Sequence, residues 1–264
     1  MFVVKIGGSK GIDYDAFVRD LANYKSFVLV HGGSHELGEI ATKLGRPPVF
    51  ITSVSGFTSR YTDRETLEIF NMVYAGKMNK MLVEKLQKAG VNAVGLTGMD
   101  GRILEGPQKE ALKIIENGKK KILRGDLSGT IERVNAKLLR LLLENGYTPV
   151  LTPPAISYES VAINVDGDRC AAQIAIALSA EKLVILSNVP GLLKNPEDAS
   201  SLITHIQRDQ ISDFIETYAK GSMKKKLLAS KEALDGGVKQ VLLGGARTEW
   251  PLTQTLNGAG TRIE

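Results

Sequence analysis

The sequence predicts an α/β fold in which a mostly parallel sheet is covered by helices on both faces. Two observations lead to this prediction. Short apolar runs of β-type residues alternate with segments whose apolar residues recur at helical spacing, which is the pattern of a doubly wound sheet. In addition, 43% of the 264 residues are hydrophobic, so the chain can bury a core as one large domain or two closely joined lobes.

The first two units of this alternation share one design, in which an apolar strand leads through glycines into a helix. Because glycine has no Cβ, the main chain at such a turn can approach phosphate oxygens closely, and a helix start favours anions. A strand followed by glycines is also an ordinary strand exit, but two adjacent units place two such turns at the carboxyl edge of one sheet, where open α/β folds bind ligands. The strands are predicted at 2–6 and 27–30, the glycines are Gly7, Gly8, Gly32 and Gly33, and the helices are predicted at 14–21 and 36–44.

The alternation changes between residues 102 and 134. Short β-type runs in this interval are separated by Asn117–Gly118 and Gly125–Asp126, which are typical turn dipeptides, so we expect antiparallel hairpins. Elsewhere the alternation of strand and helix continues. The runs inside the interval are 111–115, 121–123 and 130–134; helices are predicted at 63–74, 79–88, 136–143, 169–178 and 223–234, and strands at 91–96, around Val150, at 183–186 and at 238–243.

Two common nucleotide-binding classes are excluded by motifs that the sequence lacks. The pattern G-x-x-x-x-G-K-S/T does not occur, which excludes the P-loop kinases, and G-x-G-x-x-G is also missing, which argues against a dinucleotide dehydrogenase.

The cysteine count, the amino-terminal sequence and the histidine positions limit the cellular compartment and the metal sites that we expect. The single cysteine, Cys170, allows no disulfide and no cysteine-based zinc site, which fits a reducing compartment. The amino terminus lacks the apolar core of a signal peptide, and no run approaches the roughly 20 apolar residues of a membrane span, so we predict a cytoplasmic protein without a membrane partner. His31 and His35 stand four residues apart, but Gly32 and Gly33 interrupt any helix between them, so we predict no metal site there.

Three short segments bring glycines, lysines and a carboxylate into one chain. In phosphoryl transfer the enzyme mostly positions two reactants and neutralises negative charge on the moving group, and lysines and backbone amides serve that purpose. We therefore predict phosphoryl transfer. The segments are KIGGSKG at 5–11, INVDGD at 163–168 and GSMKKK at 221–226.

These segments belong to a longer ordered series of motifs that covers essentially the whole chain. The series is K-x-G-G, H-G-G, R-x-T-D, N-V-x-x-D, L-S-N-V-P-G, G-x-M-x-x-K and a terminal G-x-G-T, and it resembles the amino acid kinase family, in particular its acetylglutamate kinase branch. Within this branch, residues 59–74, 152–159 and 163–168 look closest to the aminoadipate kinases of carrier-protein-dependent lysine biosynthesis. Some archaeal members are similar but also accept carrier-bound glutamate, which serves arginine synthesis.

The resemblance implies an amino acid kinase fold, a three-layer αβα sandwich with an antiparallel hairpin region, in a single domain over 1–264. Its lobe 1–165 would bind the acyl substrate and form the contact of a homodimer, and its lobe 166–264 would bind the nucleotide. The implied reaction transfers a phosphoryl group from ATP, with Mg²⁺ held mainly by phosphate oxygens and water. The acceptor would be the side-chain carboxylate of aminoadipate or glutamate whose α-amino group is attached to a small acidic amino-group carrier protein.

The resemblance also implies roles for residues at matching positions. Lys5 and Lys226 would neutralise the transferring phosphoryl group, and Asp168 would hold both ammonium groups by charge-assisted hydrogen bonds. Arg60 would clamp the α-carboxylate of the substrate bidentately, and Asn164 would hydrogen-bond its other end. Backbone amides for phosphate and for the reacting carboxylate are expected at Gly7, Gly8, Gly32 and Gly33, and nucleotide contacts at Ser187, Asn188, Gly191, Leu192, Gly221 and Met223.

Three of these assignments have alternatives that the sequence leaves open. Asp168 is also suited to cap the helix predicted from residue 169, because aspartate is favoured at that position. Arg60 is compatible with a solvated loop charge. Lys224 and Lys225 stand beside Lys226, and either could take its place.

The segment 102–124 has seven basic and three acidic residues, a net charge of +4, against a formal net charge of +5 for the whole protein. A concentrated basic patch steers an acidic protein by long-range attraction. We therefore expect the acidic carrier to dock here, with a solvated surface loop as the alternative. The residues expected to dock it are Lys119, Lys120, Lys121 and Arg124.

Two other functions remain as alternatives. One is N-acetylglutamate kinase acting on the free substrate. The other is a basic nucleic-acid-binding or regulatory module, against which stand the few aromatic residues, 6% of the chain, and the lack of any helix-turn-helix, RNA-recognition or zinc pattern. We therefore expect no nucleic-acid partner.

Overall fold

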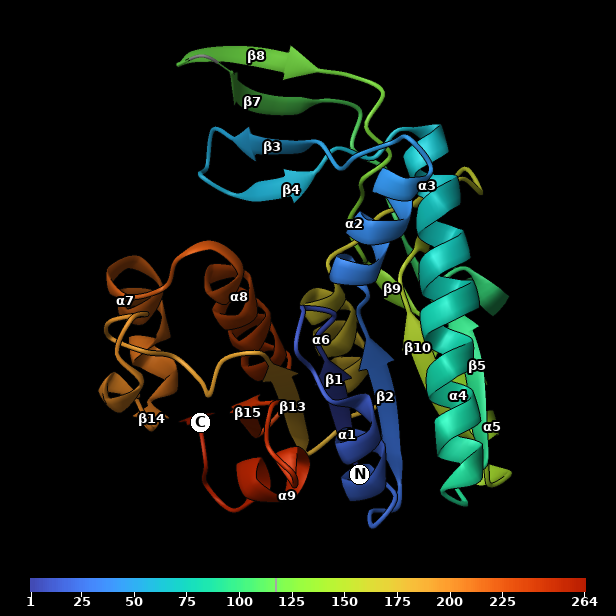
Figure 1. Cartoon of the computed structure of the whole chain (residues 1–264), viewed down its shortest axis with the longest axis vertical. Helices are drawn as coiled ribbons and strands as arrows, with labels where there is room; N and C mark the ends of the chain where they lie inside the picture. The colour runs from blue at the N-terminus through green and yellow to red at the C-terminus, as the bar shows by residue number, and fades with distance from the viewer. Residues whose placement is uncertain (117) are drawn as a thin grey trace.

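The computed structural model describes residues 1–116 and 118–264, and its centre is an eight-stranded sheet (Figure 1). The strand order β14-β16-β15-β13-β1-β2-β10-β5 places β1, from the start of the chain, directly beside β13. The β15–β16 pair is antiparallel and the other neighbours are parallel. The strands are β1 (Phe2–Ile6), β2 (Phe27–His31), β5 (Ala93–Thr97), β10 (Thr148–Thr152), β13 (Lys182–Ser187), β14 (His205–Ile206), β15 (Gln240–Gly245) and β16 (Thr261–Ile263).

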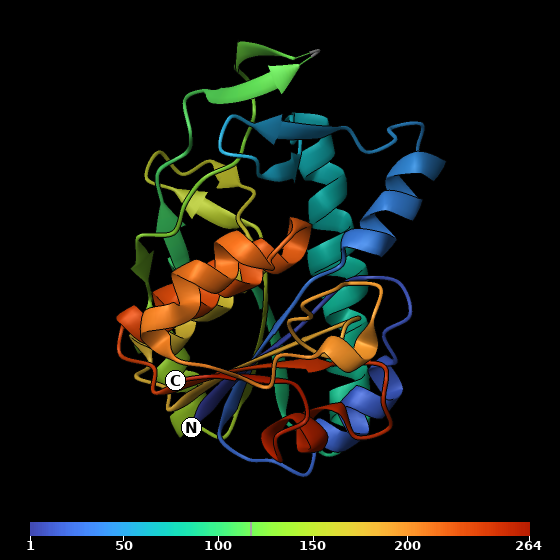
Figure 2. The same cartoon turned by 90° about the vertical axis from the view of Figure 1, so that its left-hand side faces the viewer.

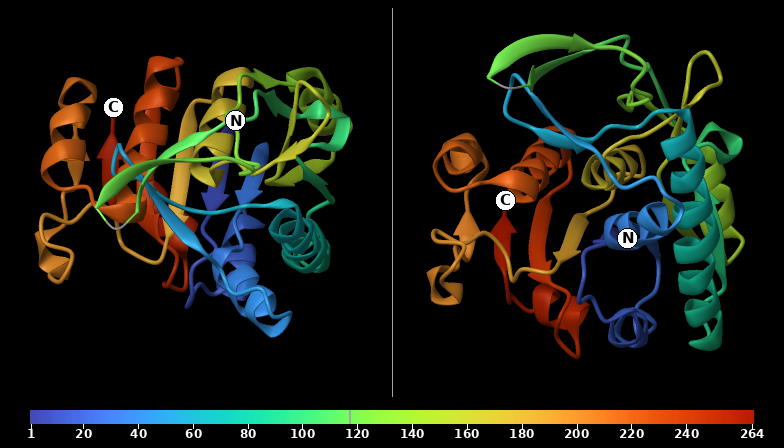
Figure 3. Two further views of the ribbon diagram at one scale, coloured as in Figure 1. Left: turned by 90° about the horizontal axis from the view of Figure 1, so that it is seen from above. Right: turned by 45° about the horizontal axis from the view of Figure 1, so that its top comes forward.

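Helices cover both faces of this sheet because alternate residues of each strand point to opposite faces (Figure 3). On β1, Val3 packs into one apolar cluster and Val4 into another. The helices of the first cluster are α5 (Ala136–Glu144), α6 (Gly167–Ala177), α7 (Ile211–Thr217) and α8 (Gly221–Asp235), and those of the second are α1 (Tyr14–Leu21), α4 (Asn79–Lys88) and α9 (Pro251–Leu256). The predicted α/β fold with a mostly parallel sheet is confirmed.

One long helical rod runs beside the sheet and was predicted as two separate helices. It consists of α3 (Arg64–Asn71), the π-helical segment η1 (Met72–Met78) and α4, which follow one another without a break (Figure 1). The backbone stays helical at both joints, so no turn separates the predicted segments 63–74 and 79–88. With α2 (Ser34–Lys43), this rod forms a third apolar cluster around Leu37, Leu67 and Phe70.

Two small four-stranded sheets lie beyond the carboxyl edge of the large one. Of the predicted hairpins, the one at Asn117–Gly118 is confirmed as β7 (Leu112–Glu116) paired antiparallel with β8 (Lys119–Leu123); Gly118 has a φ of 74°, and Asn117 lies outside the described residues. The hairpin expected at Gly125–Asp126 is wrong, because the strand that follows pairs with another sheet and not with β8. In Figure 2 the sheet β4-β3-β7-β8 stands above α8. The sequence analysis missed β3 (Phe50–Ser53), β4 (Thr58–Arg60), β6 (Leu104–Gly106), β11 (Ala155–Ser157), β12 (Ala162–Ile163), β14, β16, α7 and α9.

The run predicted at 130–134 is a strand only over its last two residues, β9 (Arg133–Val134). Ahead of it, the Thr130 and Glu132 amides donate to the carbonyls of Pro107 and Glu105. This part of the chain therefore follows the opposing loop before it enters the sheet β12-β11-β6-β9.

In the described part of the chain, no helix combines the length and the apolar character needed to cross a membrane.

Candidate active site

Two lysines from distant parts of the chain share one buried carboxylate. The Lys5 Nζ lies 2.6 Å from Asp168 Oδ1, and the Lys226 Nζ lies 3.3 Å from Asp168 Oδ2. All three residues are buried, with exposed fractions of 7%, 5% and 8% for Lys5, Asp168 and Lys226. Burial raises the pKa of Asp168, but the ammonium groups of Lys5 and Lys226 outweigh it and hold that pKa well below its ordinary value. The three residues therefore form one buried, charged unit.

The fold explains how these residues meet. Lys5 lies two residues after Val3 on β1, so it points to the face of the sheet that α6 and α8 cover. Asp168 is in the first turn of α6, and Lys226 is one turn into α8. The helix cap is supplied by Asp166, whose carboxylate accepts from the Asp168 and Arg169 amides. The alternative role of Asp168 as the cap is therefore wrong, and its side chain is free to bind the two lysines.

Because residues 224–226 are consecutive in helix α8, their three lysine side chains point in different directions. Lys226 turns inward to Asp168, Lys225 lines the cleft described below, and the Lys224 Nζ lies 5.0 Å from the centre of the Phe57 ring. Among the three, Lys226 is thus the residue that pairs with the buried carboxylate.

The two glycine turns meet backbone to backbone beside this unit. A Cβ on Gly8 would lie 2.1 Å from the Gly33 amide nitrogen, so only glycine permits the approach. The Gly7 amide donates to the Leu186 carbonyl, and the Gly32 amide donates to the Ile6 carbonyl. Of the four predicted amides, those of Gly7 and Gly32 thus extend the sheet. The Gly33 amide faces the hydroxyl of Tyr74, and neither it nor the Gly8 amide donates to a backbone carbonyl among the described residues.

A cleft of about 720 Å³ opens over these turns. Its walls include the predicted residues Arg60 and Asn164, and its roof is made by the sheet β4-β3-β7-β8, which contributes Phe50, Leu112 and Ile114. The sequence analysis missed this apolar roof, because strands of three to five residues with mixed exposure carry little periodic signal. The other predicted residues along the cleft are Lys5, Gly8, Gly32, Gly33 and Asp168.

Arg60 presents a cation to the cleft. Its guanidinium carbon lies 5.3 Å from the centre of the Phe50 ring, its Nη2 donates to the Ser34 carbonyl at 3.4 Å, and its buried Nη1 has no hydrogen-bond partner among the described residues. Burial lowers the pKa of Arg60. A half-buried guanidinium with a free N–H edge is suited to a carboxylate, and this placement argues against a solvated loop charge.

Asn164 and Tyr74 occupy other walls of the cleft. Asn164 donates from Nδ2 to the Thr62 hydroxyl at 2.9 Å. Tyr74, which comes from η1, is buried, and burial raises its pKa to about 12. The sequence analysis included Tyr74 in the motif 59–74 but gave it no role.

Comparisons with known proteins give the family of the chain. The model of the amino acid kinase family matches residues 1–244. The chain belongs to the amino acid kinase family. It is 58% identical to a LysW-aminoadipate kinase of Deinococcus radiodurans over 100% of this chain and 91% of that protein, and 52% identical to a LysW-aminoadipate kinase of Thermus thermophilus over 100% of both.

A solved structure extends the comparison. The N-acetylglutamate synthase of Neisseria gonorrhoeae, complexed with coenzyme A and N-acetyl-glutamate, has a TM-score of 0.78 and 25% identity over 99% of this chain, which spans 58% of that protein's length. The resemblance to the amino acid kinase family drawn from the sequence motifs is confirmed.

The nucleotide residues expected of an amino acid kinase lie at the same sheet edge but not along the walls of the described cleft. Ser187 ends β13, whose Leu186 is in register with Ile6 of β1, and Asn188 follows it. Leu192 is 1% exposed and packs in the core, while its amide donates to the Thr261 hydroxyl. Gly191 has a φ of 159°, and Gly221 and Met223 lie in the first turn of α8. The Leu192 side chain is thus part of the core, and its carbonyl accepts from the Ile203 amide.

The predicted carrier-docking lysines lie on the roof. Lys119, Lys120 and Lys121 are on β8 and Arg124 follows it, and all four are exposed. Lys121 is paired with Glu116 across the hairpin.

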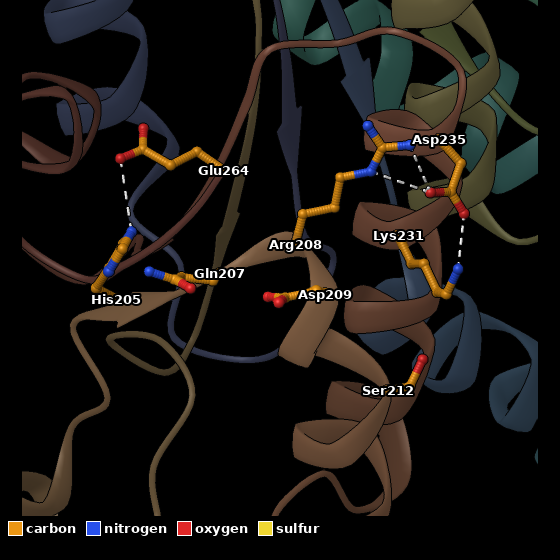
Figure 4. Close-up of a pocket in the computed structure, with 8 residues that line it drawn as sticks. All are labelled: His205, Gln207, Arg208, Asp209, Ser212, Lys231, Asp235 and Glu264. Atoms are coloured by element: carbon orange, nitrogen blue, oxygen red, sulfur yellow. Dashed lines mark hydrogen bonds and ion pairs between the residues drawn. The ribbon is translucent and has the colours of Figure 1, made fainter.

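A second hollow lies beside β14, at the amino edge of the parallel strands of the large sheet (Figure 4). Its charges pair with one another: Arg208 and Lys231 contact Asp235 at 3.0 and 2.7 Å, and His205 lies 3.5 Å from Glu264. These groups are partly exposed, so this hollow does not have the buried, polarised character of the first cleft. Among the described residues, no group of three or more His, Cys, Asp or Glu side chains is arranged to hold a metal ion.

Proposed function

We propose that this amino acid kinase transfers a phosphoryl group from ATP to the side-chain carboxylate of aminoadipate, or of glutamate, attached through its α-amino group to an acidic amino-group carrier protein. The product is an acyl phosphate used in lysine or arginine biosynthesis. The observation that carries the proposal is the buried Lys5–Asp168–Lys226 unit beside the Arg60 cleft, in a chain 58% identical to a LysW-aminoadipate kinase.

In the proposed reaction, a carboxylate oxygen of the substrate attacks the γ-phosphorus while the bond from that phosphorus to the β–γ bridging oxygen breaks and ADP leaves. Lys5 and Lys226 neutralise the three equatorial oxygens of the transferring phosphoryl group. Asp168 holds their two ammonium groups together before the substrates bind. The amides of Gly8 and Gly33 add hydrogen bonds to the same developing charge.

The substrate is held at its other groups by the walls of the cleft. Arg60 binds the α-carboxylate through its unpaired Nη1 edge, and Asn164 hydrogen-bonds the end of the substrate that leads to the carrier. The backbone of Ser187, Asn188 and Gly191 and the start of α8 at Gly221 and Met223 surround the nucleotide, as the family resemblance implies. In this arrangement the lobe 1–165 binds the acyl substrate and the lobe 166–264 binds ATP.

Mg²⁺ is proposed to enter with ATP and to neutralise its phosphates. The residues present fit an ion that phosphate oxygens and water hold, because the Asp168 carboxylate is already bound by two ammonium groups and Asp166 caps α6.

We propose that the carrier docks on the exposed basic strand β8. The segment 102–124, with seven basic and three acidic residues, forms much of the cleft's roof, so an acidic protein attracted to it would lie next to the cleft that must accept its attached amino acid. Lys119, Lys120, Lys121 and Arg124 supply the exposed charge.

The resemblance also leads us to propose a homodimer, held by the lobe 1–165, and a cytoplasmic location. Sedimentation equilibrium of the purified protein tests the dimer; a monomer mass at micromolar concentration would contradict it.

The experiment that tests the function is ATP-dependent hydroxamate formation in the presence of hydroxylamine, which traps an acyl phosphate. Three substrates are compared: carrier-bound aminoadipate, carrier-bound glutamate and free N-acetylglutamate. Activity on carrier-bound substrates alone is expected. Activity only on free N-acetylglutamate would make the protein an acetylglutamate kinase, and heparin retention without any ATP turnover would favour a nucleic-acid-binding module.

A further inference from the structure

A half-buried tyrosine ring and a buried histidine ring hold the carbonyls that precede the Gly8 and Gly33 amides. The Tyr14 hydroxyl, at the start of α1, donates to the Gly7 carbonyl at 3.1 Å. The His31 Nδ1, at the end of β2, lies 3.0 Å from the Gly32 carbonyl. Because a carbonyl only accepts, the hydrogen of His31 must be on Nδ1. Each glycine pair thus has its first carbonyl bound by an aromatic or imidazole donor.

The surroundings of His31 fix this tautomer. The Asn79 Nδ2 donates to His31 Nε2 and to the Val150 carbonyl, both at 3.0 Å. The Lys80 Nζ donates to Asn79 Oδ1 at 3.1 Å, which determines which end of the amide faces His31. His31 is 0% exposed, and burial lowers its pKa to about 4. The ring is therefore neutral near pH 7, with Nε2 as acceptor and Nδ1 as donor.

These two hydrogen bonds determine where the next amides point. The Gly7–Gly8 and Gly32–Gly33 peptides are trans, since the cis bond of the described chain is Pro153–Pro154. In a trans peptide the carbonyl and the following N–H point in opposite directions. Gly8 and Gly33 line the cleft, and neither ring does. Binding each carbonyl to its ring therefore turns the following N–H away from that ring and toward the cleft.

A glycine pair needs such a restraint more than other residues do. With no Cβ, both peptides can rotate at low cost. A rotated peptide would present a carbonyl oxygen to an anionic ligand and repel it. The amides in question lie together, because a Cβ on Gly32 would be 3.1 Å from the Gly8 nitrogen and a Cβ on Gly8 would be 2.1 Å from the Gly33 nitrogen. Neither amide donates in the backbone–backbone hydrogen bonds of the described residues, and the Gly33 amide faces the hydroxyl of Tyr74, which lines the same cleft.

We propose that Tyr14 and His31 are positioning residues that hold the Gly7 and Gly32 carbonyls out of the cleft and so keep the Gly8 and Gly33 amides directed at the transferring phosphoryl group. The proposal rests on the proposed function, because it assumes that the two amides bind that anion. Neither ring touches the substrate; each acts through the peptide that it restrains.

Tyr14→Phe removes one restraint and keeps the ring. We expect kcat for hydroxamate formation to fall about tenfold, less than the loss of a whole oxyanion donor, with the KM for the carrier-bound substrate changed by less than about twofold. The matched control is Tyr24→Phe, which also removes a hydroxyl hydrogen bond, to Thr253 at 2.8 Å, away from the cleft. Equal kcat in the two variants would overturn the role of Tyr14.

The role of His31 is tested by comparing a variant that keeps a hydrogen-bond donor for the Gly32 carbonyl with one that does not. His31→Asn places an N–H near the position of Nδ1, whereas His31→Gln places it near that of Nε2. We expect kcat about tenfold higher for His31→Asn than for His31→Gln, at matched melting temperatures. Equal losses in both variants would show that the ring serves only packing and would overturn the role of His31.

A binding measurement, which needs no catalysis, tests this inference independently of the proposed function. If the wild type phosphorylates none of the three substrates, the proposed function fails, and the affinity for inorganic tripolyphosphate, measured by calorimetry, still decides the inference. We expect Tyr14→Phe to weaken that affinity about tenfold and Tyr24→Phe to leave it unchanged. Equal affinities would overturn the inference independently of activity.

Discussion

The carboxyl edge and the amino edge of the large sheet each hold a cluster of charged side chains, and the two clusters differ in burial. At the Asp168 unit, two lysines and a carboxylate are buried together within 3.3 Å. At the hollow beside β14, Arg208, Lys231 and Asp235 make a similar three-part arrangement that stays exposed (Figure 4). Burying charges carries a large desolvation cost, whereas exposed pairs contribute little to stability. Because burial of this unit is costly, we propose a function for the buried ion pairs beside the cleft and none for the exposed ones.

The largest expected effect comes from breaking the buried unit with Asp168→Asn. The amide leaves two ammonium groups buried without a counter-charge, and such a loss costs about 3 to 5 kcal/mol. We expect this decrease in the free energy of unfolding in urea, and a fall in kcat of about 10³-fold because the lysines separate. The control is Asp235→Asn at the exposed hollow, which should leave both quantities at the wild-type value. Equal destabilisation by the two substitutions would contradict the comparison.

The next largest effect is expected from acid, because protonation of the buried His31 lowers the free energy of unfolding. Burial, aided by Lys5 and Lys80, lowers its pKa from 6.5 to about 4. Between these values the unfolded chain binds a proton that the folded chain does not, so the stability is complete above pH 6.5 and is lost as the pH falls toward 4. A shift of this size corresponds to roughly 3 kcal/mol.

Urea unfolding across this pH range measures the effect. The slope of unfolding free energy against pH should become flatter in His31→Asn and stay as in the wild type for His205→Asn, whose ring is partly exposed beside Glu264. A wild-type slope in His31→Asn would show that another group is responsible.

A smaller effect on activity is expected from substitution of Arg60, whose guanidinium is half-buried in the cleft. Arg60→Lys keeps the charge but loses the planar edge and the contact with the Phe50 ring. We expect the KM for the carrier-bound substrate to rise about tenfold with little change in kcat. Arg46→Lys, at an exposed pair with Asp63 and Glu65, is the matched control. A lower kcat at constant KM would move Arg60 from binding to the chemical step.

The smallest effect is expected on the exposed strand β8. Changing Lys119, Lys120 and Lys121 to Glu should raise the KM for carrier-bound substrate several-fold at low salt, and the difference should shrink as salt screens it. The same change of charge at the exposed lysines Lys25, Lys88 and Lys239, near the opposite edge of the sheet, is the control. If both triple variants have the same KM, carrier docking on β8 is wrong.

Much of the central sheet could be predicted because buried strands and amphipathic helices leave periodic patterns. The bounds predicted for β1, α1 and α4 are those of the structure. The roof strands β3 and β4 could not be found in this way, because they are short and their exposure follows no clear alternation. Between the predicted helices 63–74 and 79–88, residues 75–78 were not predicted as helical, because a local pattern does not show whether the backbone continues as a helix between two apolar segments.

The candidate site was also predicted unevenly. Lys5 and Asp168 were found from motifs, and the structure brings them together, but the choice of Lys226 over its neighbours needed the angle of α8 against α6. Asp166 was missed as the helix cap, although an aspartate at that position is itself a cap signal. Tyr14 and His31 were not recognised as partners of glycine carbonyls, because those hydrogen bonds depend on how the strand exits turn in space.

The sequence by itself determined the α/β class, the parallel sheet and the family, because these follow from periodicity and from ordered motifs that span the chain. Only the tertiary structure decided which lysine meets Asp168, which glycine amides bond to neighbouring strands, and which rings bind the glycine carbonyls. The physical reason is that such choices depend on distances of a few ångströms between segments far apart in the chain, which packing sets and local sequence does not encode.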